Sequence, residues 1–199
     1  MVNVLAQVMR ALHGPYYGVN QFALTITKRD KDTPAMDWSN LSSEFHRSFL
    51  ELIRSPHLLI LDLDHFCNVP NTLLNGTHIK ELYLYGIAFT SDTSHHTQLY
   101  PESSNCDISS LRIPQLEAFS TDHPSILCDM KSETTDLSFL RSLKRFDTFM
   151  DFSEDIDPAW KVIKAAASSL EDLHIDFYGK DPLTLRCHLY QFESINTKS

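Results

Sequence analysis

Two aspartates, Asp62 and Asp64, follow an apolar run at residues 58–61 and are separated from each other by one residue. This alternation is the period of a β-strand, so both carboxylates are expected on the same face of the strand. Neighbouring carboxylates can hold a metal ion in a catalytic site, bind the cationic groups of a partner, or simply be hydrated. Which of these applies depends on the elements that position them.

The run Leu-Leu-Ile-Leu-Asp-Leu-Asp at residues 58–64 resembles the first motif of haloacid-dehalogenase-type phosphotransferases. That resemblance implies a magnesium-dependent phosphohydrolase in which Asp62 and Asp64 serve as nucleophile and general acid. However, Phe66 stands where that family has a small residue, and no glycine follows the strand. We therefore keep this reaction as the alternative hypothesis and expect that the chain is not an enzyme.

Other combinations of reactive side chains lack the spacing that chemistry requires. The His95-His96 pair has no cysteine or carboxylate at ligand spacing, and the chain contains no glycine-rich phosphate loop. The four cysteines form no C-x-x-C pair, which is typical of reduced intracellular thiols. They are Cys67, Cys106, Cys128 and Cys187. We expect neither a metal site nor a cofactor.

The two aspartates belong to a repeated pattern. Leu58-x-x-Leu61-x-Leu63 recurs 21 residues later as Ile79-x-x-Leu82-x-Leu84, and looser copies begin at Leu116, Leu143 and Leu170. A degenerate sixth copy is expected at Leu24-x-Ile26, which would align Leu24 with Leu61. Repeats of roughly 20–29 residues with this pattern are typical of leucine-rich repeats.

The pattern predicts an α/β fold, an irregular leucine-rich-repeat solenoid of five or six units. Its parallel strands would form the concave face, and helices or turns would form the convex face. One domain is expected over residues 1–190, with a surface loop at 91–110 and a polar tail at 191–199.

Helices are predicted at residues 2–13, at 41–54 with Ser39 or Asn40 as the cap, and after a cap at Asp157. In the last of these, Trp160, Ile163 and Ala167 are expected to face inward. A strand is predicted at residues 22–27.

If the repeated leucines point inward, the residues between them form an exposed face. That face carries seven carboxylates and one arginine, Arg145, with aromatic side chains among them. It predicts a protein partner of basic or mixed charge, whereas the alternative is a face that is charged only for solubility. The candidate binding residues are Asp62, Asp64, Glu81, Tyr83, Tyr85, Asp122, Asp147, Phe149, Asp172, His174 and Asp176.

The chain carries a net charge of −9, which argues against nucleic acid as a partner because phosphate backbones require clustered lysine and arginine. It contains neither a signal-peptide pattern nor an apolar run that could span a membrane. The expected location is therefore the cytoplasm or the nucleus.

A longer stretch carries an ordered series of motifs. Trp38-x-x-Leu41 is followed by Leu-Ile-x-Ser-Pro-x-Leu at residues 52–58, a repeat strand, and Pro-x-x-Leu-Leu at residues 70–74. This order resembles fungal leucine-rich-repeat proteins of the F-box-like type; the resemblance covers the repeat region, and no F-box is recognised. It implies the substrate-binding part of an adaptor for a ubiquitin ligase.

Overall fold

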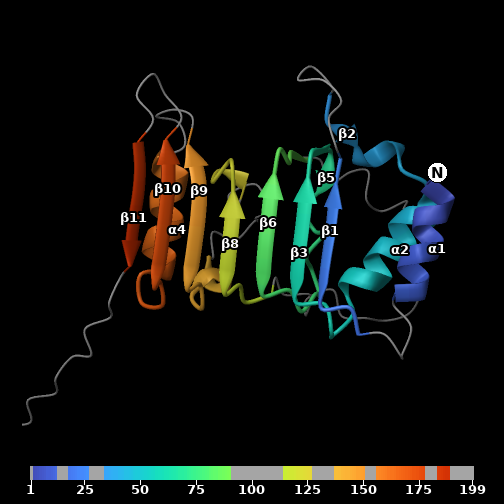
Figure 1. Cartoon of the computed structure of the whole chain (residues 1–199), viewed down its shortest axis with the longest axis horizontal. Coiled ribbons are helices and arrows are strands. Elements are labelled where there is room, and N and C mark those ends of the chain that lie inside the picture. Colours follow the sequence, from blue (N-terminus) through green and yellow to red (C-terminus); the bar gives the residue numbers. More distant parts are fainter. Residues whose placement is uncertain are drawn as a thin grey trace, which may run out of the picture.

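The computed structural model describes residues 2–12, 18–26, 34–90, 114–126, 137–150 and 156–177, together with the backbone of residues 183–188. The fold is α/β, with a mostly parallel central sheet and few helices (Figure 1). The strand order follows the chain: β1 (Gln21–Thr25), β3 (Ile60–Asp64), β6 (Glu81–Tyr85), β8 (Ala118–Thr121), β9 (Arg145–Met150), β10 (Asp172–Phe177) and β11 (Leu183–His188).

The first six of these strands pair in parallel, and only β11 runs antiparallel to its neighbour β10. Two short parallel pairs lie beyond the strand ends, β2 (Met36–Asp37) with β4 (Phe66–Cys67) and β5 (Val69–Pro70) with β7 (Phe89–Thr90). The predicted loop at 91–110 and the tail at 191–199 lie outside the described residues.

The apolar pattern determines which side of the sheet is buried. Leu61, Leu82, Phe119, Phe146 and Leu173 are register partners across five strands, which confirms the alignment of the five predicted copies. Four of them are at most 1 % exposed, and Leu173 packs on them at the end of the row. This row forms the interior face of the sheet.

The predicted register of the sixth copy was wrong. Phe22, not Leu24, pairs with Leu61, and Leu24 pairs with Leu63. A shift of two residues leaves every side chain on the same face of a strand, so alternation alone cannot exclude it.

The strands are also joined by a recurring backbone arrangement at their amino ends. One carbonyl ahead of each strand accepts hydrogen bonds from two successive N–H groups at the start of the next strand, at 2.7–3.1 Å. The accepting residues are Asn20, Leu59, Lys80, Glu117 and Lys144. The same local geometry therefore repeats through six strands, although the connecting segments differ in length.

Helix α2 (Ser43–Ile53) begins two residues later than predicted. Its cap is Ser42, whose Oγ accepts a hydrogen bond from the Phe45 N–H at 3.2 Å. Ser39 and Asn40 are unavailable as caps because they belong to a separate 3-10 turn, η1 (Trp38–Asn40), capped by Asp37. Phe45 and Phe49 of α2 pack edge-on against Trp38, with ring centroids 6.0 and 5.1 Å away.

Helix α1 (Val2–Leu12) packs on α2 through Ala6 and Met9, and both helices lie beyond the β1 edge of the sheet (Figure 1). An ion pair of 3.0 Å between Arg10 and Glu44 also joins them. In the part of the chain that the structure describes, no helix has both the length and the apolar character needed to cross a membrane.

Helix α4 (Ile156–Ala166) lies behind β9 and β10 (Figure 1). Ile163 packs against the core as predicted, but the inward direction predicted for Trp160 and Ala167 was wrong. Trp160 is 53 % exposed and Ala167 is exposed as well, while Ile163 is half-buried. The buried stripe consists of the small residues Ala159, Val162 and Ala166, which allow the helix to approach the sheet closely. Asp157 lies in the first turn and not at the predicted cap position.

A second short 3-10 turn, η4 (Ser138–Leu140), precedes β9 and contributes Phe139 and Leu140 to the core.

Candidate functional site

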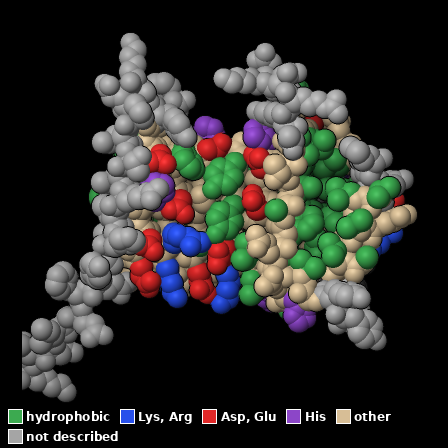
Figure 2. Space-filling model, in the orientation of Figure 1, with side chains coloured by type: hydrophobic (Ala, Val, Ile, Leu, Met, Phe, Trp, Pro, Cys, Tyr) green, Lys and Arg blue, Asp and Glu red, His purple; other side chains and the backbone are tan. Residues whose placement is uncertain are grey.

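The candidate residues lie on the side of the sheet opposite the interior row. On β3 and β6 the interior side chains are buried, while the intervening ones are half-exposed. We call this side the polar face and define it by the predicted residues together with Ser120 and Arg145. Figure 2 shows acidic side chains spread over this face around a central group of hydrophobic and aromatic ones.

Register places these residues in rows that run across the strands. The first row is Glu81, Ala118, Arg145 and Asp172; the second is Asp62, Tyr83, Ser120, Asp147 and His174; and the third contains Asp64 with Tyr85, and Phe149 with Asp176. The structure thus brings the predicted residues of four strands onto one surface. Asp122 lies one residue beyond β8.

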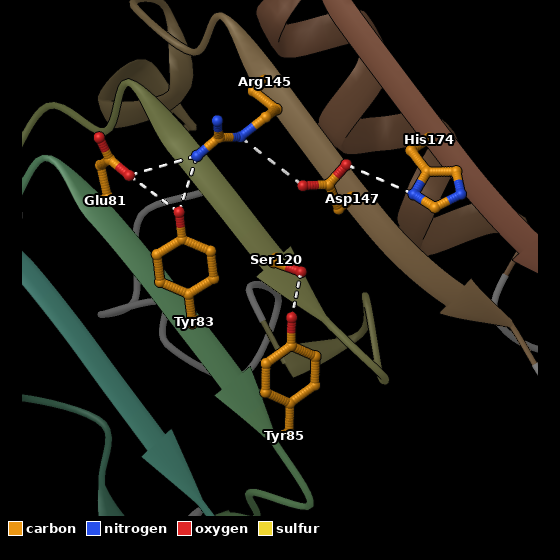
Figure 3. Close-up of polar contacts among 7 residues, drawn as sticks. All are labelled: Glu81, Tyr83, Tyr85, Ser120, Arg145, Asp147 and His174. Atoms are coloured by element: carbon orange, nitrogen blue, oxygen red, sulfur yellow. Dashed lines mark hydrogen bonds and ion pairs between the residues drawn. The ribbon is translucent and has the colours of Figure 1, made fainter. Parts of the chain in front are cut away.

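The ring of Tyr85 lies at the centre of the polar face and contacts residues of two other strands. The Tyr85 hydroxyl lies 2.6 Å from Ser120 Oγ, and Ser120 is almost fully buried beneath the neighbouring side chains (Figure 3). The Tyr85 ring also meets Phe149, with centroids 6.3 Å apart. These aromatic groups form a compact centre that holds the polar side chains around it in place.

On the side of the polar face toward β9, Arg145 lies between two carboxylates. Arg145 Nη2 donates to the Tyr83 hydroxyl at 2.7 Å and to Glu81 Oε2 at 3.2 Å, and Tyr83 itself donates to Glu81 at 2.8 Å (Figure 3). Asp147 lies between the Arg145 guanidinium group and the His174 imidazole ring, 3.7 Å from Arg145 Nε and 3.7 Å from His174 Nδ1. We call Glu81, Tyr83, Arg145, Asp147 and His174 the paired half.

The side of the polar face toward β3 differs in how its carboxylates are compensated. Asp62 has no cationic partner among the described residues, and burial together with the nearby Asp64 carboxylate raises its pKa. Among the described residues, the Asp64 carboxylate has one ion-pair contact, with the Nδ1 atom of its neighbour His65. We call Asp62, Asp64, Tyr85 and Asp122 the acidic half.

The acidic half surrounds the Tyr85 hydroxyl with negative charge. Burial raises the pKa of Tyr85, and the charges of Asp62, Asp147 and Asp122 raise it further, whereas the hydrogen bond to Ser120 lowers it. The ring is therefore held as a neutral phenol within reach of carboxylates from different parts of the sheet.

Asp122 also stabilises a turn, which was not predicted from the sequence. Its Oδ2 accepts the Gly86 N–H at 2.7 Å, which holds the turn after β6. Gly86 has φ +57°, and His65, 21 residues earlier, has φ +64° at the equivalent turn after β3. The other carboxylate oxygen, Oδ1, has no hydrogen-bond partner among the described residues.

A row of charged residues at the amino ends of the strands was missed by the sequence analysis. Lys80 lies 2.6 Å from Glu117, and Lys144 lies 3.8 Å from the same carboxyl group. The hydrogen bond from Lys80 is the main cause of the lowered pKa of Glu117. The signal was available, because each of these residues immediately precedes a repeat strand.

Strand β11 was also missed. Its backbone places Arg186 opposite His174 in the register, so the sheet continues one strand beyond the last predicted repeat. The alternation of Leu183, Leu185 and Cys187 was the signal for this strand.

Among the described residues, no group of three or more histidine, cysteine, aspartate or glutamate side chains is arranged to hold a metal ion. Asp62 lies in the middle of β3, with Tyr83 as its register partner. Lys80 and Lys144 lie at the amino ends of β6 and β9, where both are near Glu117. The arrangement as a whole is an open sheet face with an aromatic centre and two electrostatically different halves.

Comparisons of the chain with protein-family models, with curated proteins and with solved structures found no match.

Proposed function

We propose that the chain is a protein-recognition module that binds its partner through the polar face. The observation that carries this proposal is the acidic half, where carboxylates without a described lysine or arginine partner lie beside an ordered aromatic centre. Aromatic side chains provide rigid contact area, and complementary charge directs the choice of partner. A face charged only for solubility would not require the ordered centre formed by Tyr85, Ser120 and Phe149.

We propose further that the fold is an irregular leucine-rich-repeat solenoid. Two repeated features support this architecture: the carbonyl that accepts two N–H groups ahead of each strand, and the left-handed turns at His65 and Gly86. In such arrays each unit buries its apolar side only against its neighbours, which leaves the strand face free for binding.

The role as the substrate-binding part of a ubiquitin ligase adaptor is a proposal that rests on the order of the motifs alone. The residues that carry this resemblance are core residues. Trp38, Leu52, Ile53, Leu73 and Leu74 are each less than 5 % exposed. These residues stabilise the fold of the amino-terminal half. The choice of partner is therefore expected to depend on the polar face.

The position of the aspartates favours binding over the phosphohydrolase alternative. A nucleophilic aspartate of that kind needs a pocket with a lysine nearby, whereas Asp62 lies within a strand on an open face. The described lysines nearest in the register, Lys80 and Lys144, are engaged with Glu117.

Affinity capture from cell extract, read by mass spectrometry, tests the proposed function. Wild type is compared with Asp62→Lys/Tyr85→Ala and with the control Glu51→Lys, which changes an exposed carboxylate of α2 away from the polar face. We expect partners that wild type and the control retain and the double variant loses, with unchanged circular dichroism for all three proteins. Equal capture by all three would refute the proposal.

A further inference from the structure

The two halves of the polar face differ in how their negative charge is compensated. In the paired half, Arg145 lies between Glu81 and Asp147, and His174 lies beside Asp147. In the acidic half, Asp62 has no cationic partner among the described residues, and one oxygen of Asp122 has no described hydrogen-bond partner. Asp64 lies against His65 Nδ1 in the same way that Asp147 lies against His174 Nδ1. The acidic half therefore differs from the paired half in lacking, among the described residues, a lysine or arginine such as Arg145.

We infer that the partner protein supplies this cation, as a single lysine or arginine side chain that binds between Asp62, Asp64 and the ring of Tyr85. This inference rests on the proposed function and specifies the chemistry of the partner. It assigns the acidic half as the anchor of the interface and the paired half as a surrounding surface that needs no charged group from the partner.

The aromatic ring makes the acidic half suitable for a side chain. A cation within about 6 Å of a tyrosine ring centroid is attracted by the ring face, and the attraction is stronger where water is displaced. The Tyr85 ring is held by its hydroxyl contact with Ser120 and by its contact with Phe149. Because the ring is already fixed, binding costs little further loss of side-chain freedom.

The shape of the polar face favours a peptide segment over a small cation. Asp62 and Asp64 lie two residues apart on β3, and among the described residues no group of three or more histidine, cysteine, aspartate or glutamate side chains is arranged to hold a metal ion. Neighbouring strands lie about 4.8 Å apart, so Asp147 on β9, three strands from Asp62, is roughly 14 Å away and cannot join it as a ligand. A chain segment lying across the strands can place one basic side chain in the acidic half and uncharged side chains over Tyr83 and Phe149.

A displayed library of random nonapeptides tests this inference without knowledge of the natural partner. The folded chain is used as bait in three forms: wild type, Asp62→Asn/Asp64→Asn, and the control Glu51→Gln/Asp157→Asn, which removes two exposed carboxylates from α2 and α4. We expect wild type and the control to select peptides with lysine or arginine at one fixed position. The Asp62/Asp64 variant is expected to lose this preference and to bind the selected peptides at least tenfold more weakly.

A fourth bait, Tyr85→Ala, separates the possible failures. Selected peptides that depend on Tyr85 but carry no fixed basic residue would overturn this inference and leave the proposed function standing. Peptides whose binding is unchanged in both polar-face variants, or a library without any selected peptide, would count against both. Equal weakening by the control and by Asp62→Asn/Asp64→Asn would mean that net charge alone attracts the peptides, which also overturns the inference.

Discussion

The paired half and the acidic half of the polar face are built on the same sheet, with the same alternation of side chains. The difference between them depends on Arg145, whose guanidinium group lies between Glu81 and Asp147 in the paired half. Mutual neutralisation makes a surface that is stable by itself, whereas uncompensated charge makes a surface that a partner can complete. The comparison indicates that charge content alone does not identify a binding site, because local compensation must be known as well.

The interior row underlies both halves equally, and its disruption should have the largest effect. Leu82 of β6 is 0 % exposed and lies beneath the boundary between the halves. We expect Leu82→Ala to lower the free energy of unfolding by about 2–5 kcal/mol, since it leaves a cavity, while Leu82→Met costs less than about 1.5 kcal/mol. Urea unfolding measures both. Unchanged stability of Leu82→Ala would contradict the shared core.

The turn at Gly86 belongs to the acidic half and should be the next most sensitive position. An alanine there would adopt φ +57°, and its Cβ would lie 3.1 Å from His65 Cδ2. We expect Gly86→Ala to lower the free energy of unfolding by about 1–2 kcal/mol through left-handed strain, plus the cost of moving His65.

Gly18→Ala is the matched control for this substitution. A Cβ at Gly18 would make an ordinary contact of 3.4 Å with His57 Cγ, and Gly18 is not in the left-handed region. We therefore expect a smaller change in thermal unfolding for Gly18→Ala than for Gly86→Ala. Equal changes would mean that the Gly86 turn is not strained by a side chain.

Removing Arg145 should convert the paired half into a second acidic half. Arg145→Met leaves Glu81 and Asp147 without their guanidinium group, and for such half-exposed pairs we expect a loss of about 0.5–1 kcal/mol. Peptides selected by this variant should show a second preferred position for lysine or arginine. Arg47→Met, which changes an exposed residue of α2, should select the same peptides as wild type, and an unaltered preference in Arg145→Met would contradict the comparison.

The smallest expected effect on stability has the opposite sign. Burial and the adjacent Asp64 raise the pKa of Asp62 above its ordinary value of 3.8, so the folded state favours the protonated carboxyl group. Stability is therefore reduced as the pH rises from about 3.8 through the raised pKa, and the reduction persists at neutral pH. We expect Asp62→Asn to be slightly more stable than wild type at pH 7.

This gain should disappear at acidic pH, because below the ordinary pKa the wild-type carboxyl group is protonated in both the folded and the unfolded chain. Thermal unfolding of the two proteins from pH 3 to pH 7 measures the difference. A gain for Asp62→Asn that is independent of pH would show that Asp62 is not under electrostatic strain. A residue that lowers the stability of the folded chain, as Asp62 does, is expected where binding requires it.

Much of the sheet could be predicted because the repeat is local and periodic. The five aligned copies and the inward direction of Leu61 and Leu82 follow from a period of two, which any shift of register by an even number of residues preserves. The same period could not distinguish Phe22 from Leu24 as the partner of Leu61. On α4 the spacing predicted an inward Trp160, but close approach to the sheet required the smaller Ala159 and Ala166.

The sequence by itself determined which side chains share the polar face, since alternation along each strand decides their side. Only the tertiary structure decided which of them neutralise one another. Arg145 and Glu81 are 64 residues apart, and Tyr85 and Ser120 are 35 apart. Their contacts depend on strand register and on side-chain reach across the sheet, neither of which is encoded in a local pattern. For the same reason, the acidic half could be located only when Arg145 of the paired half had been placed.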